Sequence, residues 1–436
     1  MFRGHHVKRL WLLAVVMVAA LAAPCPAEPI PFRKAIELAL QRGSVMAISV
    51  ADQQKAHDTY QQARAAYLPT IVFGSGLGYS LGIPPPLAGS APSIFNVNSQ
   101  QTLLNFSQHD LVRAARNEWR SSSLDVSDKR SAVILDAAST YLELDNALAK
   151  IKILTEAAQT ANHAEFITSQ RLKEGLDSQL DLKKSQLNVA RVQMRIAEAR
   201  AAADVARQRL ARLTGLAPEE IETVSDSIPS APAVQQEQNL VAQAVQNNPQ
   251  VRLAKERAVT AELRARAAAR ALYPSIDLVS QYQRLSNAIN NYQDFYKTFT
   301  PNSFAAGLAI RFPISDFAQH ARANAASADL LRARKEAELV RNQVEENTLR
   351  RQRDISRLAA ANDVARLEYE VAQASIEAVA AKLATGEANA RDRENARLDS
   401  SNRYSSYLDS QLALSQASLE LMRQTGELDT WALPAK

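Results

Sequence analysis

Two long stretches of this chain, residues 107–174 and 314–385, contain neither glycine nor proline. Glycine and proline interrupt helices, whereas the Ala, Leu, Gln, Arg and Glu that dominate both stretches favour them. Two shorter stretches, 176–214 and 387–425, have the same composition. A continuous helix over 107–174 is about 100 Å long, so this chain is expected to form rods rather than one compact core.

Apolar residues in these stretches recur every three, four or seven positions, the spacing of helices that pack along one another. In the first long stretch the series is Ile134, Ala137, Tyr141, Leu144, Leu148 and Ile151. In the two shorter stretches the series are Leu182, Val189, Ile196, Ala203 and Leu210 and, less regularly, Leu398, Ser405, Leu412 and Leu419. We therefore predict a mainly α protein with long antiparallel coiled-coil helices.

Short motifs recur at a fixed distance along the chain. The sequence Asn-Phe-Ser-Gln-His at residues 105–109 returns as Asp-Phe-Ala-Gln-His at residues 316–320, an offset of 211. Further pairs at this offset are Gly175 with Gly386, Asp181 with Asp392, and Thr214-Gly215 with Thr425-Gly426. Matches held over such a distance indicate a tandem duplication.

The duplication divides the chain that follows Ala27. We place a first structural repeat at residues 28–226, a linker at 227–238 and a second structural repeat at 239–436. Each repeat reads as a helix, two strands, a long helix, a sharp turn and a shorter helix. We expect each opening helix to be a single rod, roughly Phe32–Tyr67 and Asn239–Tyr273.

Four segments alternate apolar and polar residues, the period of a strand with two different faces. Their apolar positions are Ile71, Phe73, Leu77, Tyr79 and Leu81; Phe95, Val97 and Leu103; Ile276, Leu278 and Tyr282; and Phe304, Ala306, Leu308, Ile310 and Phe312. Of the 25 aromatic residues, 14 fall within 67–106 and 273–317, which is typical of aromatic bands at bilayer interfaces. The pattern favours strands that face outer-membrane lipid.

Half-buried strands packed on a protein core are the alternative, but they need an apolar partner, and the rest of the chain offers only narrow heptad stripes. Four strands do not close into a barrel, and an open sheet edge is not tolerated in lipid. Three copies supply twelve strands. We therefore predict a homotrimer with one shared 12-stranded barrel, whose loops at 82–92 and 285–302 face outward.

Residues 1–27 are expected to be a secretory signal peptide, with a basic start, an apolar run at 10–23 and small residues before Glu28. The apolar run is shorter than the roughly 20 residues of a membrane-spanning helix. The single cysteine, Cys25, lies in this segment, and a lipid anchor there is the alternative that Pro24 disfavours. A mature chain without Cys25 has no disulfide and no thiol nucleophile.

Charge and residue content exclude several functions. Removing Arg3, Lys8 and Arg9 with the signal peptide lowers the net charge from +5 to +2, too little for a nucleic-acid partner. Three copies would place the repeat-related His109 and His320 as six imidazoles at one level, but both lie just after the barrel-to-helix junction, and we expect them to be solvated first-turn residues. His57 and His163 lack neighbours at metal-ligand spacing. No catalytic site, metal or cofactor is expected, so the protein is not predicted to be an enzyme.

The duplicated halves, paired strands, unbroken long helices and glycine-marked turns resemble the TolC family of outer-membrane efflux proteins over essentially the whole mature chain. This resemblance implies a trimer whose barrel continues into a helical tunnel across the periplasm. It also implies two partners, a periplasmic adaptor protein and an inner-membrane transporter.

The resemblance assigns adaptor contacts to the turns between the helices. The first turn reads Glu174-Gly175-Leu176, which matches two of the three family positions, and the second reads Thr385-Gly386-Glu387, which matches only the glycine. Gly175, Leu176 and Gly386 are therefore the candidate contact residues. The alternative is that the glycines only allow a tight reversal between antiparallel helices.

The same resemblance places a pore constriction just after each turn glycine. Asp181 and Asp392 occupy those positions, and Asn395 stands where the family has a further aspartate. In a trimer such carboxylates form a narrow anionic ring that attracts cations. The alternative is that both aspartates are solvated acids near a helix start.

The resemblance also implies a salt bridge that closes the second turn through a tyrosine and an arginine. This chain has neither residue at those positions. Leu383 and Ala388 stand at the tyrosine and arginine positions, and Arg391 and Arg393 are the candidate substitutes.

These features predict an outer-membrane channel that is the passive exit duct of a tripartite efflux or secretion system. A secreted structural coiled-coil protein with a small β head is the alternative, and it would dissolve in salt without detergent.

Overall fold

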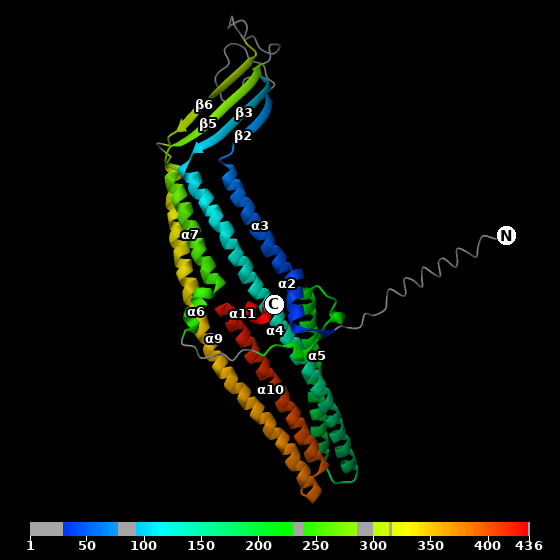
Figure 1. Ribbon diagram of the computed structural model, residues 1–436. Helices are drawn as coiled ribbons and strands as arrows, with labels where there is room; N and C mark the ends of the chain where they lie inside the picture. The colour runs from blue at the N-terminus through cyan, green and yellow to red at the C-terminus, as the bar shows by residue number, and fades with distance from the viewer. Residues whose placement is uncertain (1–28, 77–92, 231–238, 286–299, 314–315, 435–436) are drawn as a thin grey trace, which may run out of the picture. The chain divides into compact units, whose positions relative to one another are not determined.

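The structure is a computed structural model that describes residues 29–76, 93–230, 239–285, 300–313 and 316–434 (Figure 1). The predicted signal peptide, most of the predicted linker and most of the predicted outward-facing loops lie outside these residues. In chain order the main elements are β1 (Pro29–Ile30), α2 (Phe32–Arg42), α3 (Ser44–Ala65), β2 (Thr70–Gly76), β3 (Ser93–Leu104), α4 (Phe106–Lys173), α5 (Gln179–Thr214), β4 (Glu222–Thr223), α6 (Leu240–Asn247), α7 (Pro249–Arg270), β5 (Ser275–Leu285), β6 (Asn302–Arg311), α9 (Phe317–Thr385), α10 (Ala390–Thr425) and α11 (Leu428–Ala432).

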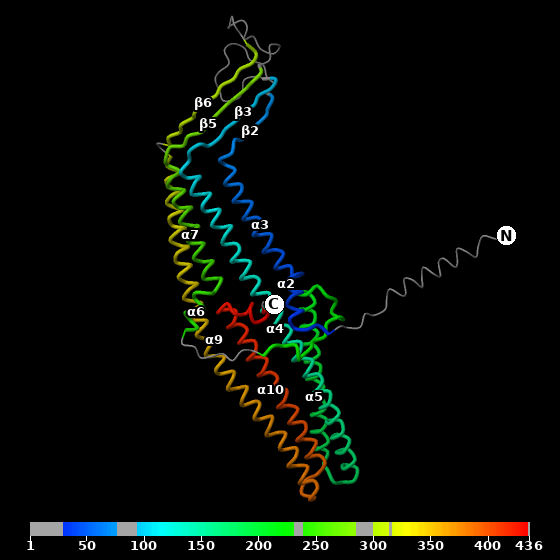
Figure 2. Tube along the Cα trace, in the orientation of Figure 1, coloured from blue at the N-terminus to red at the C-terminus, as the bar shows by residue number. Residues whose placement is uncertain are grey.

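The two glycine- and proline-free stretches form the predicted long helices. Helix α4 has 68 residues and α9 has 69. Each turns back into a 36-residue helix, α5 or α10, as the tube in Figure 2 shows. Contacts along both hairpins have the register of antiparallel helices: Thr168 meets Ser185 in the first, and the rings of Tyr369 and Tyr404 meet in the second.

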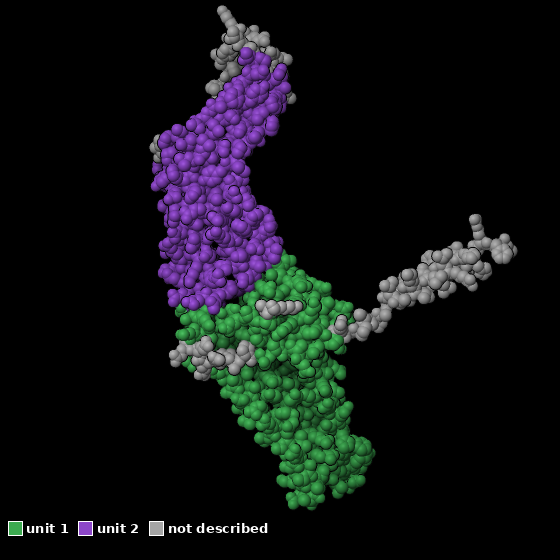
Figure 3. Space-filling model, in the orientation of Figure 1, with its two compact units in different colours: residues 1–47, 129–244, 345–436 green, residues 48–128, 245–344 purple. Residues whose placement is uncertain are grey.

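The chain forms two compact units, and neither is one of the sequence repeats (Figure 3). Unit 1 contains residues up to 47, 129–244 and 345–436, and unit 2 contains residues 48–128 and 245–344. Each unit therefore takes segments from both halves of the sequence, because the long helices run from one unit into the other.

Unit 2 contains a four-stranded antiparallel sheet in the order β2-β3-β5-β6. Its register confirms the two predicted faces. Phe73, Val97, Tyr282 and Phe304 are paired across the four strands, and the outer two are 70% and 71% exposed. The opposite face carries the amide row of Asn98 and Gln281, with Ala305 beside it. Strands β2 and β6 are the edges of this described sheet, and each pairs on one side only.

The recurring five-residue motif marks the start of each long helix in unit 2. Asn105 and Asp316 accept hydrogen bonds from the backbone N–H groups of Gln108 and Gln319, at 3.0 and 2.8 Å, and so cap α4 and α9. Each glutamine side chain then donates to a carbonyl of the neighbouring helix, Ala63 in α3 or Ala268 in α7, at 2.8 Å in both cases. The motif therefore ties each long helix to the helix that precedes the strands.

The main apolar core lies in unit 1, around α2 and α4. Tyr141 is fully buried, and its hydroxyl donates to the carbonyl of Ile30 and accepts from the N–H of Val224, both at 2.7 Å. Its ring meets Phe32 edge to face at 5.3 Å. This tyrosine therefore holds the β1 and β4 segments against the long helix.

The prediction of single opening helices is wrong. The first is divided into α2 and α3 at Gly43, where a Cβ atom would clash with the carbonyl oxygen of Ala39. The second is divided into α6 and α7 at Asn248, whose side chain caps the new helix, with Pro249 at its first position. In both cases the local backbone chemistry overrides the helix-forming composition.

In the described part of the chain, no helix combines the length and the apolar character needed to cross a membrane.

Candidate functional site

The two turn glycines, Gly175 and Gly386, have left-handed backbones with φ of 75° and 82°. A Cβ atom at either position would have nothing within 4 Å, so the conformation and not lack of space requires glycine. In each turn the N–H of the residue after the glycine bonds to a carbonyl at the end of the preceding helix: Leu176 to Arg171 and Glu387 to Lys382, both at 2.9 Å. Leu176 is 61% exposed at this turn.

Both predicted pore aspartates lie in the first turn of the helix that follows a hairpin turn, and both close capping boxes. The N–H of Asp181 donates to Ser178 Oγ at 3.2 Å, and the N–H of Ser178 donates to Asp181 Oδ2 at 3.2 Å. Asp392 and Asn389 make the same reciprocal pair at 3.0 Å. These carboxylates therefore satisfy backbone groups at the starts of α5 and α10. Asn395 is exposed one turn further along α10.

Asp181 also carries a pKa below the usual aspartate value. The hydrogen bond from the Ser178 hydroxyl is the largest cause, the bond from the Ser178 N–H follows, and the charges of Arg391 and Lys184 add to them. All four favour the ionised carboxylate.

Arg391 joins the second hairpin to the first. Its Nη1 lies 3.5 Å from Asp181 Oδ1 and 4.0 Å from Asp177 Oδ2. Asp177 is also bound by Arg171 Nε at 3.1 Å. The candidate substitute Arg391 is therefore in ion-pair contact across the two turns, whereas Arg393 pairs with Glu394 on its own helix at 3.2 Å.

Glu394 is a buried carboxylate close to these turns that the sequence analysis did not single out. Its side chain is 2% exposed and lies 3.2 Å from Arg393, 3.6 Å from Arg397 and 3.9 Å from His163 of α4. The Arg397 contact is an i,i+3 pair that the sequence contains, but the His163 contact joins different hairpins and has no sequence signal.

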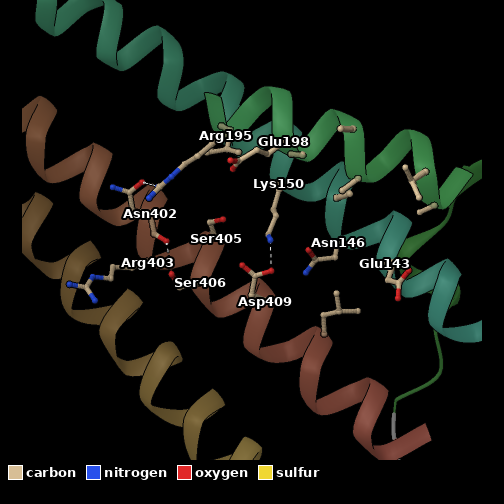
Figure 4. A pocket seen from close by; sticks show the side chains of 18 of the residues that line it. Glu143, Asn146, Lys150, Arg195, Glu198, Asn402, Arg403, Ser405, Ser406 and Asp409 are labelled. Atoms are coloured by element: carbon tan, nitrogen blue, oxygen red, sulfur yellow. Dashed lines mark hydrogen bonds and ion pairs between the residues drawn. The ribbon is translucent and has the colours of Figure 1, made fainter. Parts of the chain in front are cut away.

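A groove of about 980 Å³ lies between α4, α5 and α10 (Figure 4). Its wall includes small residues, Ala147, Ala199, Ala202 and Ala206 among them. Two polar pairs cross it: Lys150 with Asp409, and Arg195 with Asn402 (Figure 4). Both pairs connect the first hairpin to the second, so the groove is an interface between hairpins with a charged rim.

The two repeat-related histidines stand next to the helix caps of α4 and α9. His109 is exposed and lies 3.8 Å from Asp110 Oδ1. Among the described residues, no group of three or more histidine, cysteine, aspartate or glutamate side chains has the arrangement of a metal site.

A family model described as outer membrane efflux protein matches residues 35–216 and 240–427. The chain belongs to the outer membrane efflux protein family. The two matched ranges cover most of the described chain and leave out the predicted linker. No curated protein sequence matches this chain.

Solved structures of bacterial outer-membrane proteins, two of them described as channels, share the fold of this chain. CmeC of Campylobacter jejuni has a TM-score of 0.75 at 15% identity, over 91% of this chain and 86% of CmeC. VceC of Vibrio cholerae has a TM-score of 0.72 at 18% identity, over 91% of this chain and 96% of VceC. The open-state structure of MtrE from Neisseria gonorrhoeae has a TM-score of 0.72 at 17% identity, over 91% of this chain and 89% of MtrE.

These comparisons confirm the predicted family and the predicted architecture of long antiparallel helices with four strands. The roles of Gly175, Leu176, Gly386, Asp181, Asp392 and Asn395 stay predictions, because the geometry gives the glycines and aspartates local structural roles that do not exclude further ones.

Proposed function

We propose that this outer membrane efflux protein is the exit duct of a tripartite efflux or secretion system. Three copies form one duct, which lies in the outer membrane and extends into the periplasm. Cargo enters from a periplasmic adaptor and an inner-membrane transporter and passes without catalysis by this chain. The energy for transport comes from the transporter.

The observation that carries the proposal is the four-stranded sheet with one apolar face, one amide-rich face and two edges, β2 and β6, that have no further strand beside them in the described part of the chain. Each unpaired N–H or C=O group costs several kcal/mol in hydrocarbon, so β2 and β6 require partners there. Pairing the β6 edge of one copy with the β2 edge of the next satisfies both. Three copies place twelve strands in the ring, with the apolar row toward lipid and the amide row toward the lumen.

Membrane fractionation with chemical crosslinking tests the duct against a secreted coiled-coil protein. The duct is expected to sediment with outer membranes, to need detergent for extraction and to run as a crosslinked trimer. A protein that is extracted by salt alone and stays monomeric under the same crosslinking would refute the proposal.

We propose that the adaptor contacts the turns at Gly175, Leu176 and Gly386 and continues along the groove of Figure 4. The exposed Leu176 side chain and the charged rim of the groove support this, because partner surfaces combine an apolar anchor with polar pairs. A photo-crosslinking residue in place of Leu176 should capture the adaptor in cells. The same residue at Val259, which is exposed in unit 2, is the control and should not.

We propose that Asp181, Asp392 and Asn395 line the narrowest part of the pore. Asp181→Asn with Asp392→Asn removes the charge, whereas Asp181→Glu with Asp392→Glu keeps both the charge and a residue suited to the capping box. The first pair of changes should weaken cation block in planar bilayers, and the second should retain it. Equal block in both variants would assign the aspartates to helix capping alone.

A further inference from the structure

Four arginines line a groove of about 490 Å³ between α4 and α7 in unit 2. Arg113, Arg116 and Arg120 come from α4, and Arg266 comes from α7. The spacing of three and four residues places the α4 arginines on one face of that helix. The groove therefore receives guanidinium groups from two helices.

The carboxylates around this groove are already paired. Glu262, which also lines it, lies 3.0 Å from Arg266 and 3.1 Å from Arg334. Asp110 lies 2.9 Å from Arg270 and 3.9 Å from Arg113.

Arg116 and Arg120 are exposed, and within the described ranges neither has a carboxylate in ion-pair contact. The groove consequently has an excess of positive charge that its own side chains do not neutralise. A guanidinium presents planar N–H donors that match phosphate oxygens in pairs.

A second groove in unit 2 differs in lining and in charge. It is lined by residues of α3, α4, α7 and α9, and its α4 and α7 residues lie on other faces of those helices than the residues of the arginine groove. Its charges are mixed, with Glu118 and Asp125 beside Arg257 and Arg264. The described residues that line the arginine groove come from α4 and α7, and its excess charge is positive.

The arginine groove also begins close to the sheet. Helix α4 starts at Phe106, and Arg113 and Arg116 follow at about 10 and 15 Å along the helix. The rings of Phe106 and Tyr273 meet at 6.0 Å and are exposed at this junction, as interfacial aromatic residues are. If the sheet lies in the membrane, as proposed above, long arginine side chains at this depth extend to the headgroups.

We propose that the groove between α4 and α7 binds phosphate groups. The ligand is a phosphate-bearing lipid headgroup of the leaflet next to the helices, or free phosphate at the same guanidinium groups. Two helices that share one anionic ligand are thereby held together just beyond the strands.

The test uses the full-length protein in neutral detergent, with Arg116→Gln and Arg120→Gln combined. Arg252→Gln with Arg257→Gln is the matched control, since it removes the same charge from exposed arginines of α7 outside the groove. Native mass spectrometry and thermal unfolding are followed with phosphatidylglycerol, with inorganic phosphate and with phosphate-free diacylglycerol. Circular dichroism and the crosslinked oligomer show that each variant is folded.

Wild type and control should bind phosphatidylglycerol and not diacylglycerol, with binding weakened by salt. The groove variant should bind about tenfold less tightly, as expected for lost charge-assisted bonds. Equal binding of inorganic phosphate would identify free phosphate as the source, and binding of phosphatidylglycerol alone would identify the headgroup.

Unchanged phosphate binding by the groove variant overturns the proposal, and so does an equal loss in the control. A groove variant that loses its oligomer but keeps phosphate binding shows that the arginines pair with carboxylates of another copy, which also overturns it. The inorganic phosphate arm does not require a membrane, so its outcome is separate from that of the proposed duct.

Discussion

At the scale of single residues, the turns of both hairpins depend on glycines that only backbone geometry requires. The left-handed backbone at Gly386 disfavours any residue with a Cβ, although no neighbouring atom would clash with it. Because there is space for a Cβ atom, glycine is required here only by the φ angle of the turn.

Replacing Gly386 with alanine should loosen the second turn by about 1 kcal/mol, the usual cost of a left-handed alanine. Hydrogen exchange of the backbone at the end of α9 should accelerate about fivefold. Gly307→Ala is the control, since Gly307 has an ordinary φ and open space around its Cα, and it should leave this exchange unchanged. No acceleration in Gly386→Ala would mean that the turn adopts a different backbone.

The capping box at Asp181 makes the first turn sensitive to acid. Its pKa is lower in the folded protein than in the unfolded chain, mainly because of the Ser178 hydrogen bonds. The stabilisation is therefore present above the unfolded pKa, near the ordinary aspartate value, and is lost as pH falls through the folded pKa. The protection factors for hydrogen exchange at the start of α5, which correct for the intrinsic pH dependence of exchange, should fall over that pH range.

In Asp181→Asn this acid dependence should disappear, while Asp181→Glu should retain part of it because glutamate also closes capping boxes. An Asp181→Asn variant with the same acid response as wild type would assign the effect to another carboxylate.

At the scale of helices and strands, the recurring motif at residues 105–109 and 316–320 has a physical role that its repetition alone did not reveal. Gln108 and Gln319 each donate a side-chain hydrogen bond to the helix before the strands. The two bonds have the same length, 2.8 Å, and come from the same motif position.

Gln108→Ala should lower the free energy of unfolding by about 1 kcal/mol, the typical net value of one hydrogen bond. Gln108→Glu should cost more, because a carboxylate then faces the carbonyl of Ala63. Unfolding in detergent, followed by circular dichroism, measures both. Gln411→Ala, which removes an exposed bond within α10, is expected to have little effect. Equal stability of the alanine and glutamate variants would contradict the role given to the donor.

The sequence predicted the helices and strands that have a strong periodic pattern. It did not predict the helix breaks that depend on one or two residues. Helix α4 was predicted because helix-forming residues occupy its whole length. The alternation of apolar and polar residues predicted that Phe73 and Asn98 lie on opposite sides of the sheet. The break at Gly43 was not predicted, because one glycine in a helical pattern is usually tolerated. Here the glycine is extended, at φ −65° and ψ 128°, which ends α2.

The sequence indicated the positions of the turn glycines and of Asp181 and Asp392, but it did not predict the capping boxes that these aspartates form. Their predicted role in a pore stays a prediction. The groove of Figure 4 has no local signal, since Lys150 and Asp409 are 259 residues apart. The contact of Glu394 with His163 also has no local signal in the sequence, because it depends on how the two hairpins pack.

At the scale of the whole molecule, the two compact units mix segments from both halves of the sequence. A duplicated chain therefore does not fold here as two copies of one domain. In unit 2 the β3–β5 pair joins a strand of the first half to a strand of the second, so the sheet is complete only when both halves contribute. In unit 1 polar contacts join the hairpins of the two halves, and the contact at Arg391 lies next to their turns.

If three copies form the proposed duct, breaking that contact should open the end of the duct at which these turns lie. Arg391 is the cation shared by Asp177 and Asp181, so Arg391→Gln leaves two carboxylates of the first hairpin without their partner on the second. Asp177 keeps its ion pair with Arg171 and Asp181 keeps its capping box, but the hairpins lose this contact at their turns. Single-channel conductance in planar bilayers should rise. Arg366→Gln removes the same charge from an arginine whose partners, Asp363 and Glu370, lie on its own helix, and it should conduct like wild type. If Arg391→Gln and Arg366→Gln conduct equally, the ion pair at the turns does not hold the hairpins together.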